Sequence, residues 1–272
     1  MRISISSYLL LSSWLLFTGS GVFAQYSAGI KGGISIPNLT ARGSENNPLN
    51  TGYSTRVGAD AAIFGEYNFT PQFSVEVSLE YSSQGGKKNG NQALPVPSYV
   101  SSMYPPGLAP SYLWASFDQE AKLNYFMIPI LGKYTFYLGP NSPWSIYIDA
   151  GPFAGFLLSA KTVASGSSNV YADQAHTQPL TSAPISFALT QDVKDSLRST
   201  NFGIEGNIGV AYALGPGRII LEGGGNYGFV NIQKNKDDGQ NNTGAVTVRI
   251  GYSYMFGSGP RGEKSVREPK VF

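Results

Sequence analysis

Hydrophobic and polar residues alternate along most of the chain after residue 25, which is the pattern of β-strands with one apolar and one polar face. The clearest example is 72–82, where five apolar residues from Phe73 to Tyr81 alternate with Gln, Ser and Glu. The same alternation predicts eight strands, at 26–36, 55–69, 72–82, 122–137, 144–158, 201–213, 218–230 and 245–256.

The seven connections between these strands alternate in length. In chain order they contain 18, 2, 39, 6, 42, 4 and 14 residues, so every short turn lies between two long loops. Transmembrane β-barrels sort their connections in this way, whereas a soluble sandwich has no reason to do so. The pattern predicts an all-β fold: an eight-stranded antiparallel up-and-down transmembrane β-barrel with short periplasmic turns and long extracellular loops.

The positions of the aromatic residues favour lipid outside the barrel. A soluble lipocalin-like barrel is the alternative, with its apolar face lining a cavity. Aromatic residues gather near both ends of the predicted strands on the apolar face, as Phe73 and Tyr81 do, and this distribution is typical of the two interfacial girdles of membrane barrels.

Composition narrows the possible functions. Only 13% of the 272 residues are charged, against about 25% in a typical soluble domain. There is no Cys and only one His, His176, so a disulfide framework and a Cys- or His-rich metal site are excluded. The net charge of +2 gives no reason to expect nucleic-acid binding. We expect no cofactor.

The first 24 residues have the pattern of a secretory signal peptide. Met1 and Arg2 begin the chain, 8–17 is an apolar run, and 22–24 (VFA) fits a cleavage site. The run is shorter than the roughly 20 residues of a membrane-spanning helix. We therefore expect a signal peptide at 1–24, a barrel at 25–257 and a flexible basic periplasmic tail at 258–272.

Four motifs resemble one protein family. They are GIKGG at 29–33, LNYFMIPILGKY at 123–134, DAGP at 149–152 and YGFVNI at 227–232. Together they resemble the PorT-type outer membrane β-barrel proteins of Bacteroidetes over about residues 25–257. The resemblance implies a barrel in the cell outer membrane. One branch of that family serves protein secretion, so an accessory role in secretion is an implied function.

The polar faces place many charged residues inside the predicted barrel. An interior formed by eight strands is just wide enough for side chains to fill it. The predicted inward charges are Lys31, Arg56, Asp60, Glu66, Glu76, Glu80, Lys133, Asp149, Glu205, Arg218, Glu222 and Arg249. Because unpaired buried charge is costly, we expect a plug of salt bridges. Strand order suggests pairing Lys31 with Asp60, Lys133 with Asp149, and Glu222 with Arg249. A small pore for ions or solutes is the alternative.

The second long loop is a candidate binding surface. Residues 93–114 hold five prolines together with Tyr99, Tyr104, Tyr112 and Trp114. Exposed aromatic residues commonly anchor interfaces. These side chains either bind a partner or pack with the loop over the barrel mouth.

We expect no enzymatic activity. His176 lies in the third long loop close to Asp173 and several serines, but such residues are common in loops and do not establish a catalytic triad. The sequence therefore predicts a non-enzymatic structural or interaction protein of the cell envelope. Its partners would be outer membrane lipid and other envelope or secretion proteins.

Overall fold

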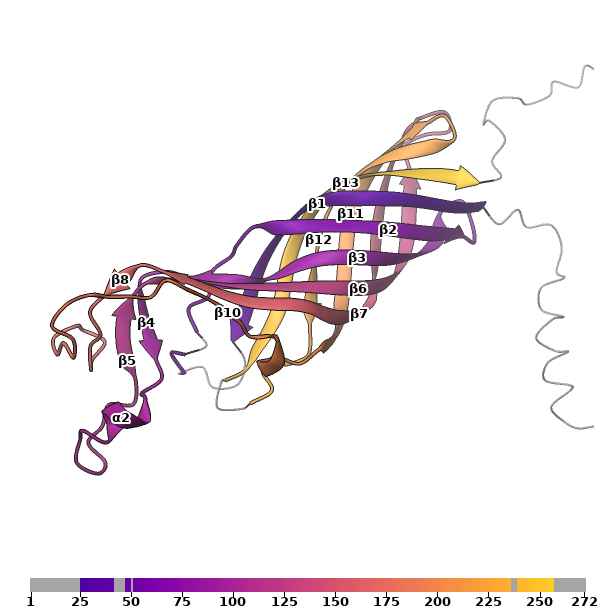
Figure 1. The fold of residues 1–272 in the computed structure, drawn as a ribbon. Coiled ribbons are helices and arrows are strands. Elements are labelled where there is room, and N and C mark those ends of the chain that lie inside the picture. The colour runs from indigo at the N-terminus through magenta and orange to yellow at the C-terminus, as the bar shows by residue number, and fades with distance from the viewer. Residues whose placement is uncertain (1–24, 42–46, 50, 236–238, 257–272) are drawn as a thin grey trace, which may run out of the picture.

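The computed structural model describes residues 25–41, 47–49, 51–235 and 239–256. Eight long strands form the body of the molecule (Figure 1). They are β1 (Gln25–Ala41), β2 (Gly58–Asn68), β3 (Phe73–Lys88), β6 (Asp118–Tyr137), β7 (Trp144–Ser165), β11 (Thr200–Leu214), β12 (Gly217–Gly228) and β13 (Asn241–Phe256). The eight-stranded fold predicted from the alternation is confirmed.

The eight strands close into a ring. Each pairs antiparallel with its neighbours in the chain, and β13 returns to pair with β1, from Tyr26 opposite Phe256 to Ala41 opposite Asn241. The short connections, 69–72, 138–143 and 215–216, all lie at one end, here called the turn end. The longer connections lie at the opposite end, called the loop end. The predicted order of long and short connections is thus present in the fold.

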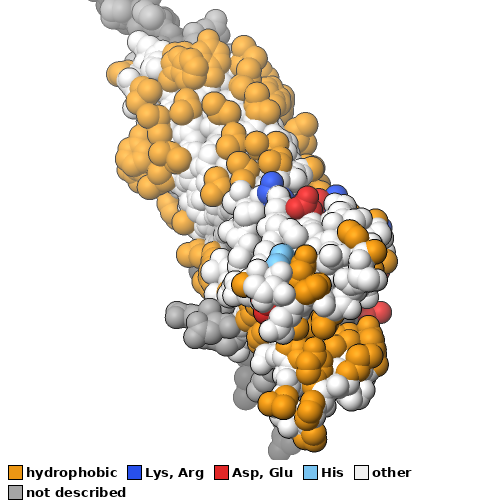
Figure 2. All heavy atoms as spheres, turned by 90° about the vertical axis from the view of Figure 1, so that its left-hand side faces the viewer, with side chains coloured by type: hydrophobic (Ala, Val, Ile, Leu, Met, Phe, Trp, Pro, Cys, Tyr) orange, Lys and Arg blue, Asp and Glu red, His pale blue; other side chains and the backbone are white. Residues whose placement is uncertain are grey.

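The apolar faces of the strands point outward. Ile30, Val77 and Ile250 are all exposed on the barrel wall, and hydrophobic side chains cover this wall in Figure 2. Aromatic rings follow one another around the turn end, where Tyr26 contacts Tyr67 and Tyr67 contacts Phe69. The same strands place polar side chains inside, so the closely packed core of this protein is largely polar.

Five strands extend beyond the predicted limits at the loop end by four residues or more, among them β1 to Ala41 instead of 36 and β13 from Asn241 instead of 245. β3 ends at Lys88 instead of 82, β7 continues to Ser165 instead of 158, and β6 begins at Asp118 instead of 122. Alternation stops there because loop residues cover both faces, and five successive residues from Ser82 to Gly86 are buried. In contrast, β2 begins at Gly58 and not at 55, because regular pairing with β1 begins at Gly58; before it, the Arg56 N–H donates to Pro37 O of β1 at 3.1 Å.

The long loops carry small elements of their own. The connection after β3 forms a hairpin of β4 (Asn91–Leu94) and β5 (Leu113–Ser116), with the short helix α2 (Ser98–Ser101) at its tip. The connection after β7 contains β8 (Ser167–Ser168), β9 (Ile185–Ser186), β10 (Leu189–Asp192) and the 3₁₀ turn η1 (Lys194–Ser196). Figure 1 shows the hairpin beyond the loop end of the barrel, so it does not fold over the mouth.

Two predicted segments, the signal peptide at 1–24 and the tail at 258–272, lie outside the described residues. Within the part of the chain that the structure describes, no helix has the length and hydropathy needed to cross a bilayer.

Candidate functional site: the barrel interior

All eight barrel strands contribute charged side chains to the interior. Ten of the twelve predicted inward charges are at most 4% exposed. They are Lys31, Asp60, Glu66, Glu76, Glu80, Lys133, Asp149, Glu205, Glu222 and Arg249. This burial follows from strand geometry, because every second residue of a closed barrel faces inward.

Arg249 is the centre of one half of this network. Its guanidinium nitrogens lie 2.7 Å from Asp60 Oδ1, 2.9 Å from Glu80 Oε1, 2.9 Å from Glu205 Oε1 and 3.4 Å from Glu222 Oε1. The four carboxylates come from β2, β3, β11 and β12. A planar guanidinium with several donors suits such a position better than an ammonium. Ion pairs of Arg249 therefore connect β13 to four other strands.

The two interior lysines link the remaining carboxylates. Lys31 Nζ lies 2.8 Å from Glu76 Oε1 and 2.8 Å from Glu222 Oε2. Lys133 Nζ forms ion pairs with Glu66, at 3.2 Å, and with Glu76. Glu76 is thus shared by both lysines, and the network continues across the barrel through side chains of five strands.

Neutral donors supplement the cations, because seven of these ten buried groups are acidic. Asn207 Nδ2 donates to Asp149 Oδ1 at 2.8 Å and to Glu205 Oε1 at 3.2 Å. Tyr147 donates its hydroxyl to Glu222 at 2.7 Å. Serines do the same on β3, where Ser74 donates to Glu66 and Ser82 to Asp60. Hydrogen bonds of this kind reduce the cost of burying carboxylates.

The charged residues at the two ends of the barrel are placed differently. Arg218 is half-buried at the turn end, 3.3 Å from Glu66 Oε2. Arg56 lies before β2 and not within a barrel strand, so its predicted interior position is corrected. It is buried near the loop end, where Nε lies 2.8 Å from Glu120 Oε1 and Nη1 donates to Gln84 O at 2.9 Å.

Lys88, the last residue of β3, lies at the same end of the barrel. Its Nζ donates to Leu49 O at 2.8 Å and lies 4.7 Å from the centre of the Tyr53 ring. Burial lowers the pKa of Lys88 to about 8, because removing the ammonium group from water disfavours its charged form.

The interior pairs differ from those suggested by strand order. Glu222 and Arg249 form an ion pair as predicted. Lys31 lies opposite Ala62 in the β1–β2 register and pairs with Glu76 and Glu222, not with Asp60. Lys133 and Asp149 are opposite each other on β6 and β7, yet the Lys133 ammonium forms its ion pairs with Glu66 and Glu76.

An apolar layer, which the rule of polar residues inside the barrel does not predict, fills the interior nearer the loop end. Leu123, Tyr125 and Met127 of β6 point inward and are at most 2% exposed. The layer also contains Leu39, Ala121, Phe153, Leu157, Ala160, Leu197 and Ile232. The signal was present in the sequence, because β6 is apolar on both faces from Tyr125 to Leu131. A strand with two apolar faces in this fold contacts lipid on one side and an apolar interior on the other.

Gly209 provides a test of how closely the interior is packed. A Cβ atom at Gly209 would overlap the Tyr147 ring, whose hydroxyl is fixed by Glu222. At the lipid-facing Gly132 the nearest atom to such a Cβ is 3.8 Å away. We expect Gly209→Ala to lower the free energy of unfolding by about 1–3 kcal/mol, as overpacking does. Gly132→Ala is the matched control and should be close to neutral. Urea unfolding of both variants measures the difference, and equal stability of the two would mean that the interior can rearrange.

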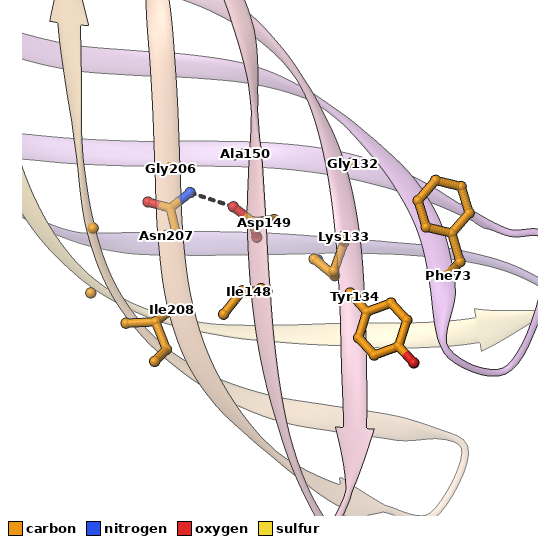
Figure 3. A pocket seen from close by; sticks show the side chains of 12 residues that line it. Phe73, Gly132, Lys133, Tyr134, Ile148, Asp149, Ala150, Gly206, Asn207 and Ile208 are labelled. Carbon is orange, nitrogen blue, oxygen red and sulfur yellow. Dashed lines mark hydrogen bonds between the residues drawn. The ribbon is translucent and has the colours of Figure 1, made fainter.

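Small residues also leave a shallow depression on the outer wall, shown in Figure 3. It has a volume of about 590 Å³ and lies across β6, β7, β11 and β12. Gly132, Ala150 and Gly206 form its floor, while the hydrogen bond from Asn207 to Asp149 lies behind the wall. Since the depression is apolar and faces lipid, it is part of the membrane-facing surface.

The candidate binding loop is only partly exposed. Tyr99 is 66% exposed, whereas Tyr104, Tyr112 and Trp114 are half-buried. Tyr104 packs beside Val100, Leu113 and Val170, which joins the second and third long loops. The exposed apolar residues near Tyr99 are Met103 and Leu108.

His176 and Asp173 do not have the geometry of a catalytic pair. The His176 ring stacks on Tyr171, with ring centres 4.2 Å apart, and its Nε2 lies 2.9 Å from Asn91 Oδ1. The Asp173 carboxylate accepts hydrogen bonds from the backbone N–H groups of Thr177 and Gln178. Across the residues described here, no group of three or more His, Asp or Glu side chains is placed to hold a metal ion.

Solved structures of bacterial outer membrane proteins are similar to this chain. Neisserial surface protein A is 13% identical, with a TM-score of 0.37, and the match covers 84% of this chain and 96% of that one. Ail of Yersinia pestis is 12% identical, with a TM-score of 0.36, and the match covers 85% of this chain and 99% of that one. OprG from Pseudomonas aeruginosa is 13% identical, with a TM-score of 0.37, and the match covers 85% of this chain and 96% of that one.

A comparison with curated proteins found no match. The family model described as outer membrane protein beta-barrel domain matches residues 23–234. This range includes seven of the eight barrel strands completely and most of the interior charges. The chain therefore belongs to the outer membrane β-barrel domain family, and it is a protein of the cell outer membrane.

Proposed function

We propose that the protein is a closed, non-enzymatic barrel that anchors and presents its long loops at the cell surface. The observation that carries this proposal is the burial of the interior charges, ten of which are at most 4% exposed. A water-filled channel would leave the side chains that line it in contact with water. Shared ion pairs and the apolar layer at Leu123, Tyr125 and Met127 occupy that space instead.

A planar-bilayer recording tests whether the barrel conducts. Refolded protein should give no steady conductance across a range of salt concentrations, because ion passage would require breaking the pairs of Arg249 and Lys133. A water-filled porin of 16–18 strands, recorded in the same lipid, is the positive control. Steady channels from the purified barrel would support the small pore for ions or solutes instead.

The orientation in the membrane is part of the same proposal. Membrane barrels have short periplasmic turns and long external loops. Because the chain has no Cys, Gln178→Cys in a long loop and Asn141→Cys in a short turn each introduce a single thiol, both at exposed positions. We expect a membrane-impermeant maleimide to label Cys at position 178 on whole cells. Labelling at position 141 should require a broken outer membrane, and the reverse pattern would invert the topology.

Three further features complete the proposal. The signal peptide at 1–24 would direct export, and the basic segment at 258–272 would lie in the periplasm. The motif at 123–134 resembles PorT-type proteins, which supports an accessory role in protein secretion. The non-enzymatic assignment is supported by the engagement of the Asp173 carboxylate with Thr177 and Gln178, away from the His176 ring.

A further inference from the structure

The tip of the β4–β5 hairpin carries a second hydrophobic surface. Tyr99, Met103 and Leu108 are 66%, 74% and 70% exposed, and we call these three residues the apolar tip. Figure 2 shows hydrophobic side chains gathered at this end of the molecule and separated from the barrel wall by a largely polar zone. The apolar tip is therefore distinct from the surface that contacts the barrel's own membrane.

The hairpin is fixed to the third long loop. Trp114 and Tyr171 exchange two backbone hydrogen bonds, of 2.9 and 2.8 Å. Phe117 stacks on Phe187 with ring centres 4.5 Å apart, and Asn91 donates to Gln174 O at 2.9 Å. These contacts hold the base of the hairpin in place. Binding through the apolar tip would therefore cost less conformational entropy.

Six backbone N–H groups at the tip are bonded within the tip itself. The N–H groups from Val100 to Tyr104 and of Leu108 donate to carbonyls of residues 97–105, and positions 105 and 106 are prolines, which have no N–H. The hydroxyls of Ser101 and Ser102 donate to backbone carbonyls three residues earlier. A segment that enters lipid must satisfy its polar groups in this way, whereas a segment that binds protein can leave them for the partner.

The charge and the exposed area of the apolar tip also favour lipid over protein as its partner. Residues 89–117 contain no Lys, Arg, Asp or Glu, so entry into an apolar phase would bury no charge. Three side chains of this size expose on the order of 400 Å², which is about half of what one partner contributes to a standard protein interface of about 800 Å² per side. We infer that the apolar tip inserts into the surface of a second lipid bilayer that faces the cell.

This inference rests on the proposed role of the barrel as a support for its loops, but its test is independent of conductance. A barrel that conducts could still bind vesicles, and a silent barrel could fail to bind them. The apposed membrane needs no anionic lipid, because the tip has no cation to attract phosphate. Binding should therefore be insensitive to salt.

An environment-sensitive fluorophore can report the insertion. The full barrel, held in a phosphatidylcholine nanodisc, would carry the dye on Met103→Cys at the tip or on Lys194→Cys in the exposed η1 turn. Adding phosphatidylcholine vesicles should shift the emission at position 103 to shorter wavelength and leave position 194 unchanged. Leu108→Asp, at a position 70% exposed and therefore compatible with folding, should abolish the shift at 103. Heat modifiability on a gel confirms that each variant is folded.

Three outcomes would overturn the inference. The first is unchanged emission at position 103 when vesicles are added. The second is an equal shift at positions 103 and 194, which would indicate non-specific adsorption. The third is a shift that depends on protein concentration without vesicles, which would assign the tip to a second copy of this chain.

Discussion

Replacing Arg249 with Met is expected to prevent the barrel from folding or to destabilise it by at least about 3–5 kcal/mol, because it leaves buried carboxylates without their cation. Asp60, Glu80 and Glu205 each lie within 3 Å of the guanidinium, and Glu222 lies 3.4 Å away. Met has a similar length, so the loss of charge outweighs the change of volume. Urea unfolding of protein refolded into vesicles measures the effect.

The Arg249 variant has a matched control in Arg218. Arg218 also faces inward, but it is half-buried at the turn end, and within the described part of the chain its one ion pair is with Glu66. Because a partly hydrated ion pair contributes about 0–1 kcal/mol, Arg218→Met should unfold close to the wild-type urea concentration.

A second comparison separates charge from packing. Adding Glu80→Gln and Glu205→Gln to Arg249→Met removes two of the stranded charges, and part of the lost stability should return. If Arg249→Met alone unfolds at the wild-type urea concentration, the interior network does not hold the barrel together.

The sequence was sufficient to predict the strands and their facing because both depend on a local pattern. Val77 and Glu76 are adjacent, and a period of two places one in lipid and the other inside wherever the strand lies in the ring. The same parity identified Lys31 and Lys133 as inward charges, and both are buried.

The interior pairs could not be predicted because they depend on register and on reach across the barrel. Lys31 on β1 bonds to Glu222 on β12, which is not a neighbouring strand. The shear of the barrel, which is the stagger between neighbouring strands, decides which interior residues lie at the same height. No pattern in the sequence gives this stagger. The apolar layer was missed for a different reason. The rule of polar residues inside fails at Tyr125 and Met127, where interior neighbours such as Phe153 are also apolar.

The extension of β3, β6 and β7 was missed because loop contacts cover it. Alternation requires one face in lipid or water, but 82–86 are buried on both faces. Gly85, with a φ of 117°, also breaks the strand pattern in a way that only glycine readily allows.

Val77→Arg is expected to destabilise the folded barrel in the membrane by about 2–4 kcal/mol, the cost of arginine at the lipid-facing midplane of barrels. Val77 is 43% exposed on the outer wall and lies midway between the aromatic residues Phe73 and Tyr81. The segment from Phe73 to Tyr81 has nine residues, and a tilted strand crosses a membrane with about 9–11 residues. Arginine at Val77 would therefore have the longest path to either interface.

Two control variants isolate the contribution of lipid. Val77→Leu keeps an apolar side chain at the same position and should refold as the wild type does. Gln191→Arg places the same charge on the exposed strand β10, beyond the membrane-facing wall, and should also be neutral. The folded fraction on a heat-modifiability gel, read after refolding into vesicles, compares all three. Folding of Val77→Arg at the level of Val77→Leu would place this face of β3 in water and would contradict the lipid-facing assignment of the barrel wall.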